Sequence, residues 1–354
     1  MTDTTRFVVV DRSDPRSVEV REEPHAPLED GQVRFKVDSF AFTANSVTYM
    51  VAGDMLGYWD FYPFDLSWGR SPVMGHGEVV ESAHPDVPVG GRYFGWFPIA
   101  TDVVVNVEPS ASGLRDVGEH RSSHNLVYRT FEASDDPASE DHTALIRGLF
   151  TTSFLADDFL ADNDDFGATQ AIVLSASSKT GIALGWCLTR RGHHAIGATS
   201  PGNAEFVRSL GCWDEVVTYD ELGDLDGSVR TNLVDMSGNS DAVSTVHRTF
   251  DGTLGHSMLI GMTHWESPRS SDPLPGPAPA MFFAPSQIDK RLAEWGSDGY
   301  DARVGETWKE FSAWSNDWLT VTRYSGIEDA MRAYQSVVAG HAKPNEGLIL
   351  SLNE

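Results

Sequence analysis

The chain has 354 residues, of which 40% are hydrophobic and 22% charged, and this composition is typical of a globular protein with two domains. Its net charge of −26 argues against nucleic acid as a partner, because a phosphate backbone requires a basic protein face. The sequence has no run of about 18 apolar residues that would predict a membrane span, and its first residues lack the pattern of a secretory signal, so we expect a cytoplasmic protein.

Residues 1–142 predict a β-rich first domain. Short runs rich in Val and Phe recur without a long helix between them, for example RFVVVD (6–11) and VRFKVDSFAF (33–42). This spacing indicates a small barrel or a sandwich. The stretch 107–142 is polar and poorly patterned, and we expect it to form a long connection or a surface excursion.

The pattern changes at residue 143, where a helical stretch is followed by alternating strands and helices. This order predicts a doubly wound parallel sheet for residues 143–279. The segment 267–279 is rich in Pro and Ser and is expected to be a loop. The tail 280–354 does not repeat the strand–helix order, and we expect it to return to the first domain.

The stretch IVLSASSKTG (172–181) leads from an apolar strand into a turn of small residues and then into a helical pattern. A dinucleotide-binding fold carries three glycines at such a turn, for the tight bend, for close approach of the pyrophosphate and for helix–strand packing. Here Ala176 or Ser175 takes the first place, Ser178 the second and Gly181 the third. Serine hydroxyls can donate to phosphate, and the helix N-terminus and a lysine favour an anion. The candidate cofactor-binding residues of this turn are Ser175, Ala176, Ser177, Ser178, Lys179, Thr180 and Gly181. The alternative is a strand–helix turn that binds nothing.

The end of the second predicted strand bears on the choice of cofactor. NAD-preferring folds carry Asp or Glu there, whereas this chain has Thr199 and Ser200, with Asn203 close behind. No carboxylate would repel a 2′-phosphate, and the Ser200 hydroxyl can donate a hydrogen bond to one. The sequence therefore favours NADP(H) over NAD(H). Gly261 ends the last predicted strand of the sheet, where a close ligand or a tight turn requires a small residue.

Taken in order, several segments resemble the medium-chain dehydrogenase/reductase superfamily, in particular its zinc-free quinone oxidoreductase and enoyl reductase branch. These segments are VRFKVDSFAFTANSVTYM, SPVMGHGEVVESAHPDVPVGGRYFGWF, IVLSASSKTGIALGWCLTRRG, NLVDMSG and HSMLIGM. More narrowly, NSVTYM, FGWFP, TTSFLADDFL, SASSKTG and SPGNAEFVRSLGC look like the DUF2855 subfamily, a domain of unknown function. The resemblance implies a GroES-like β-barrel domain split in sequence by a Rossmann-type domain, with cofactor and substrate in the cleft between them and with a homodimer as the assembly.

Zinc-dependent members of that superfamily carry a Cys near the start of the segment that matches residues 45–50, and a His-Glu pair in a Gly-His-Glu motif. This chain has no Cys there, since its two cysteines are Cys187 and Cys212, and the motif reads Gly-His-Gly around His76. A metal is therefore not expected, and we interpret His76 as structural.

The resemblance also implies a chemistry. Zinc-free members transfer a hydride from NADPH to an activated C=C bond or a quinone, while the protein stabilises negative charge on a carbonyl oxygen. Asn45 matches an Asn that lines the nicotinamide cleft, Thr48 and Tyr49 follow it, and a Tyr hydroxyl can donate to an enolate oxygen. Asp235 ends a strand that lies next to the cofactor in the family. The alternatives are a packed aromatic for Tyr49 and a turn or N-cap carboxylate for Asp235.

The loop 53–69 is denser in aromatic residues than a surface loop needs. It predicts either an aromatic wall for a flat or apolar substrate, or a packing plug or dimer contact. The candidate substrate contacts in and beyond this loop are Tyr58, Trp59, Tyr62, Trp96 and Phe282.

We therefore expect a zinc-independent, NADPH-dependent oxidoreductase that reduces an α,β-unsaturated carbonyl compound or a quinone. Its substrate would be a small molecule, an apolar or aromatic carbonyl compound. The alternative is a non-redox protein of the same fold, a lyase or a scaffold, that binds nucleotide weakly or not at all; the missing turn glycines favour this second hypothesis.

Overall fold

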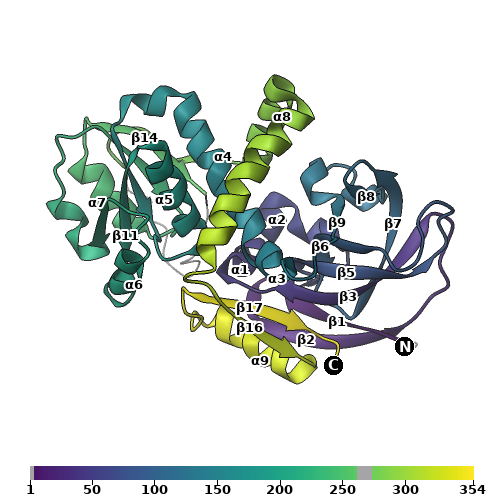
Figure 1. Cartoon of the computed structure of the whole chain (residues 1–354). Helices are drawn as coiled ribbons and strands as arrows, with labels where there is room; N and C mark the ends of the chain where they lie inside the picture. Colours follow the sequence, from purple (N-terminus) through teal and green to yellow (C-terminus); the bar gives the residue numbers. More distant parts are fainter. Residues whose placement is uncertain (1–3, 261–272) are drawn as a thin grey trace. The chain divides into compact units, whose positions relative to one another are not determined.

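The computed structural model describes residues 4–260 and 273–354, and the chain divides into two compact units (Figure 1). Unit 1 contains Met1–Leu145 and Leu319–Glu354, and unit 2 contains Ile146–Trp318. The expected fold class, an antiparallel barrel combined with a doubly wound parallel sheet, is confirmed.

Unit 1 is built around a closed antiparallel barrel. In order around the barrel, its strands are β3 (Gln32–Ala41), β5 (Pro72–Ser82), β6 (Arg92–Pro98), β9 (Thr130–Ala133), β8 (Gly113–Asp116) and β7 (Asp102–Ser110), and β7 pairs back onto β3. The buried rings of Phe35, Phe97 and Phe131 fill its interior, with centroids 5.0–5.5 Å apart. The stretch 107–142 was expected to be a connection, and that expectation is wrong for β8 and β9. β8 forms a tight hairpin with β7, with Ser110 opposite Gly113, and is too short to show a strand pattern of its own. β9 pairs with β8 and with β6, and neither of these strands adjoins it through a short turn.

The rest of unit 1 surrounds this barrel. β17 (Glu346–Ser351) pairs with β3, and β16 (Thr320–Ser325) runs parallel to β17. A separate sheet contains β1 (Thr4–Asp11), β2 (Asp14–Pro24) and β4 (Trp68–Gly69). The helices are α1 (Ala44–Val51), α2 (Gly53–Leu56), α3 (Glu140–His142) and α9 (Ile327–Val338), with short 3₁₀ turns η1 (Tyr58–Phe61), η2 (Glu119–Arg121) and η3 (Leu126–Tyr128). A π-helical turn, η4 (Thr143–Arg147), follows α3.

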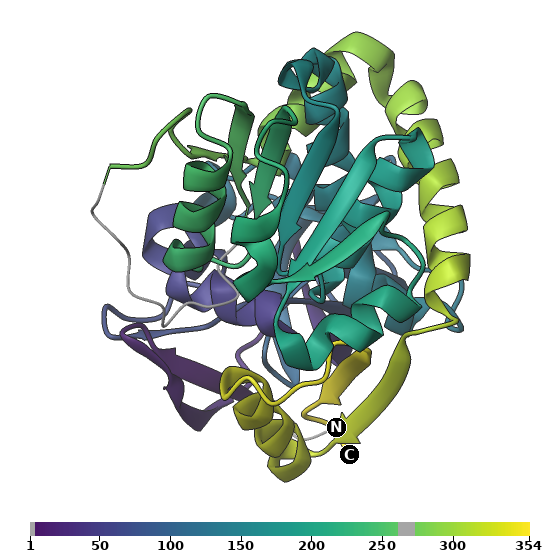
Figure 2. The ribbon, with the colours of Figure 1, turned by 90° about the vertical axis from the view of Figure 1, so that its left-hand side faces the viewer.

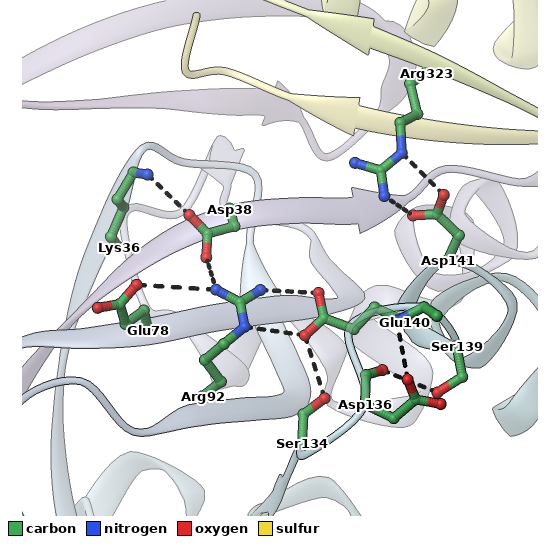
Figure 3. A network of polar contacts seen from close by, with 11 residues as sticks. Lys36, Asp38, Glu78, Arg92, Ser134, Asp136, Ser139, Glu140, Asp141 and Arg323 are labelled. Atoms are coloured by element: carbon green, nitrogen blue, oxygen red, sulfur yellow. Dashed lines mark hydrogen bonds and ion pairs between the residues drawn. The ribbon is translucent and has the colours of Figure 1, made fainter.

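Arg92 on β6 anchors α3 to the barrel (Figure 3). Its guanidinium donates to both Glu140 carboxylate oxygens at 3.0 and 2.8 Å and to Asp38 at 2.7 Å. The next residue, Asp141, accepts two hydrogen bonds from Arg323 on β16. The segment that leaves unit 1 through α3 is thus tied both to the barrel and to the first strand of the returning chain.

Unit 2 contains a parallel sheet in the order β12-β11-β10-β13-β14-β15 (Figure 2). Its strands are β10 (Gln170–Leu174), β11 (His194–Thr199), β12 (Glu215–Thr218), β13 (Thr231–Asp235), β14 (Leu254–Leu259) and β15 (Ala280–Met281). Its helices are α4 (Gly148–Asp162), α5 (Lys179–Arg191), α6 (Ala204–Ser209), α7 (Ser240–Thr249) and α8 (Ala284–Ser315), with 3₁₀ turns η5 (Asp164–Gly167), η6 (Pro201–Asn203) and η7 (Tyr219–Asp224).

Helices cover both faces of this sheet. α4 and α5 contribute Leu160 and Leu184 to the apolar cluster on one face, and α7 contributes Val246 to the cluster on the other. Because both faces are covered, a central strand can carry a continuous apolar run, as AIVL in β10 shows.

Helix α8 belongs to unit 2, so the expected return of residues 280–354 to the first domain is wrong for this segment. It packs on α4, where Arg291 bonds to Asp158 at 2.6 Å, and the Phe311 ring stacks on Phe150 at 4.9 Å. The chain returns at Leu319 instead. Gly296 (φ 72°) interrupts the regular helical geometry of α8. None of the helices within the described parts of the chain combines the length and apolarity that crossing a bilayer would require.

Candidate nucleotide-binding site

The β10–α5 turn (residues 175–178) lies at the carboxyl end of the central strand of the unit 2 sheet. β10 pairs with β11 on one side and with β13 on the other, so the strand order reverses direction here. In open α/β sheets, ligands bind outside the carboxyl ends of the strands at such a switch point. The turn that the sequence singles out therefore occupies the characteristic ligand position of this sheet topology.

Ser175 makes the tight bend of this turn. Its φ of 61° lies in the left-handed region that favours glycine, and its side chain is buried. The Ser175 N–H donates to the Tyr219 hydroxyl at 3.2 Å, and the Ala176 N–H donates to the Ala198 carbonyl at 3.0 Å. Of the two residues expected at the first glycine position, Ser175 has the backbone conformation that glycine would supply.

Ser178 caps helix α5. Its hydroxyl accepts from the Gly181 N–H at 3.0 Å and donates to the Ser175 carbonyl at 2.8 Å. A serine hydroxyl has one proton to donate, and here that proton is used inside the turn. The expected donation from the Ser178 hydroxyl to a phosphate is therefore not available in this conformation.

Gly181 sits where the helix and the strand approach most closely. A Cβ added at this position would lie 2.4 Å from the Ser175 carbonyl oxygen and 3.2 Å from Cα of Ala176. This is the packing requirement of the third glycine in a dinucleotide turn. Ser153 on α4 strengthens the junction, because its buried hydroxyl donates to the Thr180 carbonyl at 2.8 Å.

Two backbone amides at the start of α5 are open to a ligand. Within residues 4–260 and 273–354, the N–H groups of Ser177 and Thr180 have no acceptor. First-turn amides lack intrahelical partners and carry the positive end of the helix dipole, so they attract anions. Both residues are half-buried, and Lys179 between them adds a positive charge. These two amides are the strongest feature of the site for holding a diphosphate.

The end of β11 adds a small polar cluster beside the turn. The Ser177 hydroxyl accepts from the Thr199 hydroxyl and from the Asn203 side-chain amide, both at 3.2 Å. Ser200 is half-buried and makes no capping bond with its hydroxyl. The structure thus brings together Ser177, Thr199 and Asn203, three residues that the sequence proposed separately. Nothing acidic stands between Thr199 and Asn203 to repel a 2′-phosphate.

Asp235 ends β13 and organises its own turn. Its carboxylate accepts from the Ser237 N–H at 2.7 Å, the Ser237 hydroxyl at 2.6 Å and the Gly238 N–H at 3.1 Å. These are the contacts of a turn carboxylate, the alternative that the sequence left open. Gly261, the other strand-end candidate, lies outside the described residues.

Tyr219 is a residue of this site that sequence reasoning missed. It directly follows β12, so it lies at the same carboxyl edge of the sheet as Ser175 and Thr199. Burial raises the pKa of Tyr219 to about 12, which keeps the hydroxyl protonated at neutral pH. The available signal was its place at the end of the third strand of the alternating pattern.

In unit 1, Asn45 and Tyr49 form a pair one turn apart on α1. The Asn45 side-chain amide donates to the Tyr49 hydroxyl, whose own proton has no acceptor in the part of the chain that the structure describes. Burial raises the pKa of Tyr49 above its usual value, so the hydroxyl retains this proton. Thr48, between them, donates to the Ala44 carbonyl at 3.5 Å and joins neither group.

The other aromatic candidates of unit 1 are mostly packed. Tyr49 contacts the rings of Tyr58 and Trp96 at centroid distances of 4.8 and 5.1 Å. Trp59 is 2% exposed, and its ring fills the space above two glycines of this unit. Tyr62 is also buried and donates to the Trp96 carbonyl. These contacts are those of the packing plug, the second of the two hypotheses for this loop.

Phe282 belongs to unit 2, whereas the other aromatic candidates belong to unit 1. It packs on Phe159 with a centroid distance of 5.6 Å and lines a cavity of about 220 Å³ together with His256 and Gln287. Burial lowers the pKa of His256, so this cavity is lined by neutral groups.

The sequence of the chain matches a known family, and its fold matches solved structures. A family model described as "Protein of unknown function (DUF2855)" matches residues 40–343. No match to the chain is found among curated proteins. CurA from Vibrio vulnificus, solved in complex with NADPH, is similar over 99% of both chains, with a TM-score of 0.60 and 13% identity.

Two further solved structures share this architecture. The quinone oxidoreductase from Coxiella burnetii has a TM-score of 0.52 and 13% identity, and the yhdH oxidoreductase from Salmonella enterica, in complex with NADP, has a TM-score of 0.54 and 14% identity. Each similarity covers 98% of this chain and 99% of the other. At these identities the structural likeness establishes the fold, whereas the family model spans most of the sequence. The chain belongs to the DUF2855 family.

Proposed function

We propose that this protein is a zinc-independent, NADPH-dependent oxidoreductase that reduces an activated C=C bond or a quinone. The observation that carries the proposal is the β10–α5 turn, where a left-handed Ser175, a sterically required Gly181 and two open amides coincide at the switch point of the sheet. The solved structures that share this fold include an NADPH complex of CurA, a quinone oxidoreductase and an NADP complex of the yhdH oxidoreductase, which supports the choice of reaction class.

The residues of unit 2 fit a dinucleotide with a 2′-phosphate. The amides of Ser177 and Thr180 would hold the diphosphate, because they lack protein acceptors in the described chain. Ser200 and Asn203 would take the 2′-phosphate, since both are polar, neutral and placed directly after β11. Glycine at position 181 is what allows α5 to start this close to the strand.

NADPH would supply the hydride, and the protein would supply binding, orientation and a hydrogen bond to the carbonyl oxygen of the substrate. The Tyr49 hydroxyl is the donor we assign to this oxygen. Its raised pKa makes it a stable hydrogen-bond donor, because it keeps its proton at neutral pH. The Asn45 side-chain amide donates to the same hydroxyl, so the Tyr49 proton points away from Asn45. Such a donor favours negative charge that develops on the oxygen during hydride addition.

Zinc independence rests on the segment Gly-His-Gly around His76. A Cβ at Gly77 would lie 2.8 Å from the Lys36 carbonyl oxygen, so the position of the family's Glu ligand has no room for a side chain here. His76 is buried, and burial lowers its pKa to about 4. Both cysteines lie in unit 2 and are buried.

The decisive test is titration of the protein with NADPH. Trp213 can report binding, because its ring lies close to the turn. The Trp213 ring and Ala176 of the turn both border Gly197: a Cβ added at Gly197 would lie 2.7 Å from the ring and 3.0 Å from Cβ of Ala176. We expect NADPH to quench tryptophan fluorescence and to raise the melting temperature, with most of the quenching lost in the Trp213→Phe variant. Absence of both effects at millimolar NADPH would refute the proposal.

Cofactor choice is tested by the same titration with NADH. We expect NADPH to bind at least about tenfold more tightly, which corresponds to one charge-assisted hydrogen bond. The Ser200→Asp variant should reverse this order, because the new carboxylate repels the 2′-phosphate and can accept from the ribose 2′-hydroxyl. Equal affinities in the unmodified protein would contradict the NADP(H) assignment.

A second candidate function is a non-redox protein of this fold that binds nucleotide weakly. The observation that favours it is the Ser178 hydroxyl, which already caps α5 and donates to Ser175, so the turn is partly satisfied by its own groups. Weak binding of NADPH without hydride transfer to any quinone or enone would support this candidate.

A further inference from the structure

The β10–α5 turn replaces the glycine of its tight bend with a residue that resists the required conformation. Ser175 has φ of 61°, where a Cβ crowds the following carbonyl and glycine is the residue normally found. The residue is 6% exposed, so solvent does little to relieve the bend. A serine kept in this conformation requires surrounding contacts that hold it there.

The contact that stands out is the one from Tyr219. The Ser175 N–H donates to the Tyr219 hydroxyl at 3.2 Å, across more than forty residues of sequence. The Tyr219 ring packs against the apolar cluster on the α7 face of the sheet, so its hydroxyl is held at a defined place. The Ser178 hydroxyl and the Ser178 N–H meet the Ser175 carbonyl at 2.8 and 2.9 Å, which fixes the other end of the same peptide segment.

We infer that Tyr219 is a positioning residue for the nucleotide turn, which holds Ser175 in the left-handed conformation and so sets the direction of the Ser177 and Thr180 amides. This inference rests on the proposed function, because it assigns those amides to the diphosphate of NADPH. Tyr219 acts through Ser175 in this arrangement. The serine and the tyrosine together do what a glycine does alone in a dinucleotide turn.

The test is a double-mutant cycle of Tyr219→Phe and Ser175→Gly, with both the dissociation constant for NADPH and the melting temperature as readouts. Tyr219→Phe should weaken NADPH binding by about fivefold, the effect of one lost hydrogen bond, with kcat unchanged at saturating NADPH. In the Ser175→Gly background the same change should weaken binding by less than about twofold, because glycine adopts the bend without support.

A matched control is Tyr334→Phe, which removes another buried tyrosine hydroxyl, in unit 1, whose partner is the Pro15 carbonyl at 2.7 Å. This variant should lower the melting temperature and leave the NADPH affinity unchanged. A NADPH affinity that does not change in Tyr219→Phe, or that falls equally in both backgrounds, would overturn the inference.

The melting temperatures separate this inference from the proposed function. If the unmodified protein binds no NADPH, the proposed function fails and the turn has no nucleotide role. The melting temperatures of the cycle then still test whether Tyr219 holds Ser175. Tyr219→Phe should lower the melting temperature more in the unmodified protein than in the Ser175→Gly variant. Equal destabilisation in both would show that Tyr219 does not hold Ser175.

Discussion

Gly181→Ala should break the junction between β10 and α5. The added Cβ would lie 2.4 Å from the Ser175 carbonyl oxygen, about 1 Å inside an ordinary contact, and 3.0 Å from Oγ of Ser178. Neither neighbour can yield easily, because the first is backbone and the second caps the helix. The start of α5 must therefore move away from the strand. Forced overpacking of this size costs about 1–3 kcal/mol, which corresponds to a fall in melting temperature of about 2–12 °C for a domain of the size of unit 2.

The same displacement moves the Thr180 amide, so NADPH affinity should fall by more than about tenfold. Thermal unfolding and NADPH titration on one preparation measure both effects. The matched control is Gly305→Ala in α8, where an added Cβ meets nothing within 4 Å. This change should raise stability by up to about 1 kcal/mol through helix propensity. If Gly181→Ala melted and bound NADPH as the unmodified protein does, the account of this turn would be wrong.

Three further predictions concern unit 1. Glu140→Gln removes a carboxylate that accepts two hydrogen bonds from Arg92 (Figure 3). The free energy of unfolding, measured by chemical denaturation, should fall by about 1–3 kcal/mol and no more, because Asp38 still pairs with the arginine. An unchanged free energy of unfolding would show that the network is dispensable. Tyr49→Phe should lower kcat for quinone or enone reduction by about tenfold or more with NADPH affinity unchanged, and an unaltered kcat would remove Tyr49 from the mechanism. Burial lowers the pKa of His76 to about 4, below its unfolded value near 6.5, so the unfolded state binds more protons between these values. The free energy of unfolding should therefore be highest above about pH 6.5 and should fall by up to about 3 kcal/mol as the pH is lowered towards 4. In His76→Gln this dependence should be flatter, as denaturant unfolding at several pH values would show.

Local patterns predicted the architecture of this protein well. The alternation of apolar strands and helical segments after residue 143 is a short-range property, and it led directly to the parallel sheet and to the turn at its centre. The strand β9 escaped prediction, because it pairs with β6 and β8, which no short turn connects to it. β8 escaped prediction although it forms a tight hairpin with β7, because its four residues are too few to show a strand pattern. The extent of α8 in unit 2 was likewise decided by contacts such as Phe311 on Phe150, which no local pattern contains.

The site shows the same division. Composition and spacing proposed the residues of the β10–α5 turn and the neutral end of β11 as candidates, because these follow from which residue types stand at the ends of strands. The contacts of each residue were decided by the tertiary structure alone. Ser175 adopts the left-handed conformation, and the Ser178 hydroxyl caps the helix and donates to the Ser175 carbonyl. The hydroxyl of Tyr219, which follows the strand β12, accepts from the Ser175 N–H. A sequence states which donors and acceptors exist, but their partners depend on distances across the sheet, and those distances are set only when the chain packs.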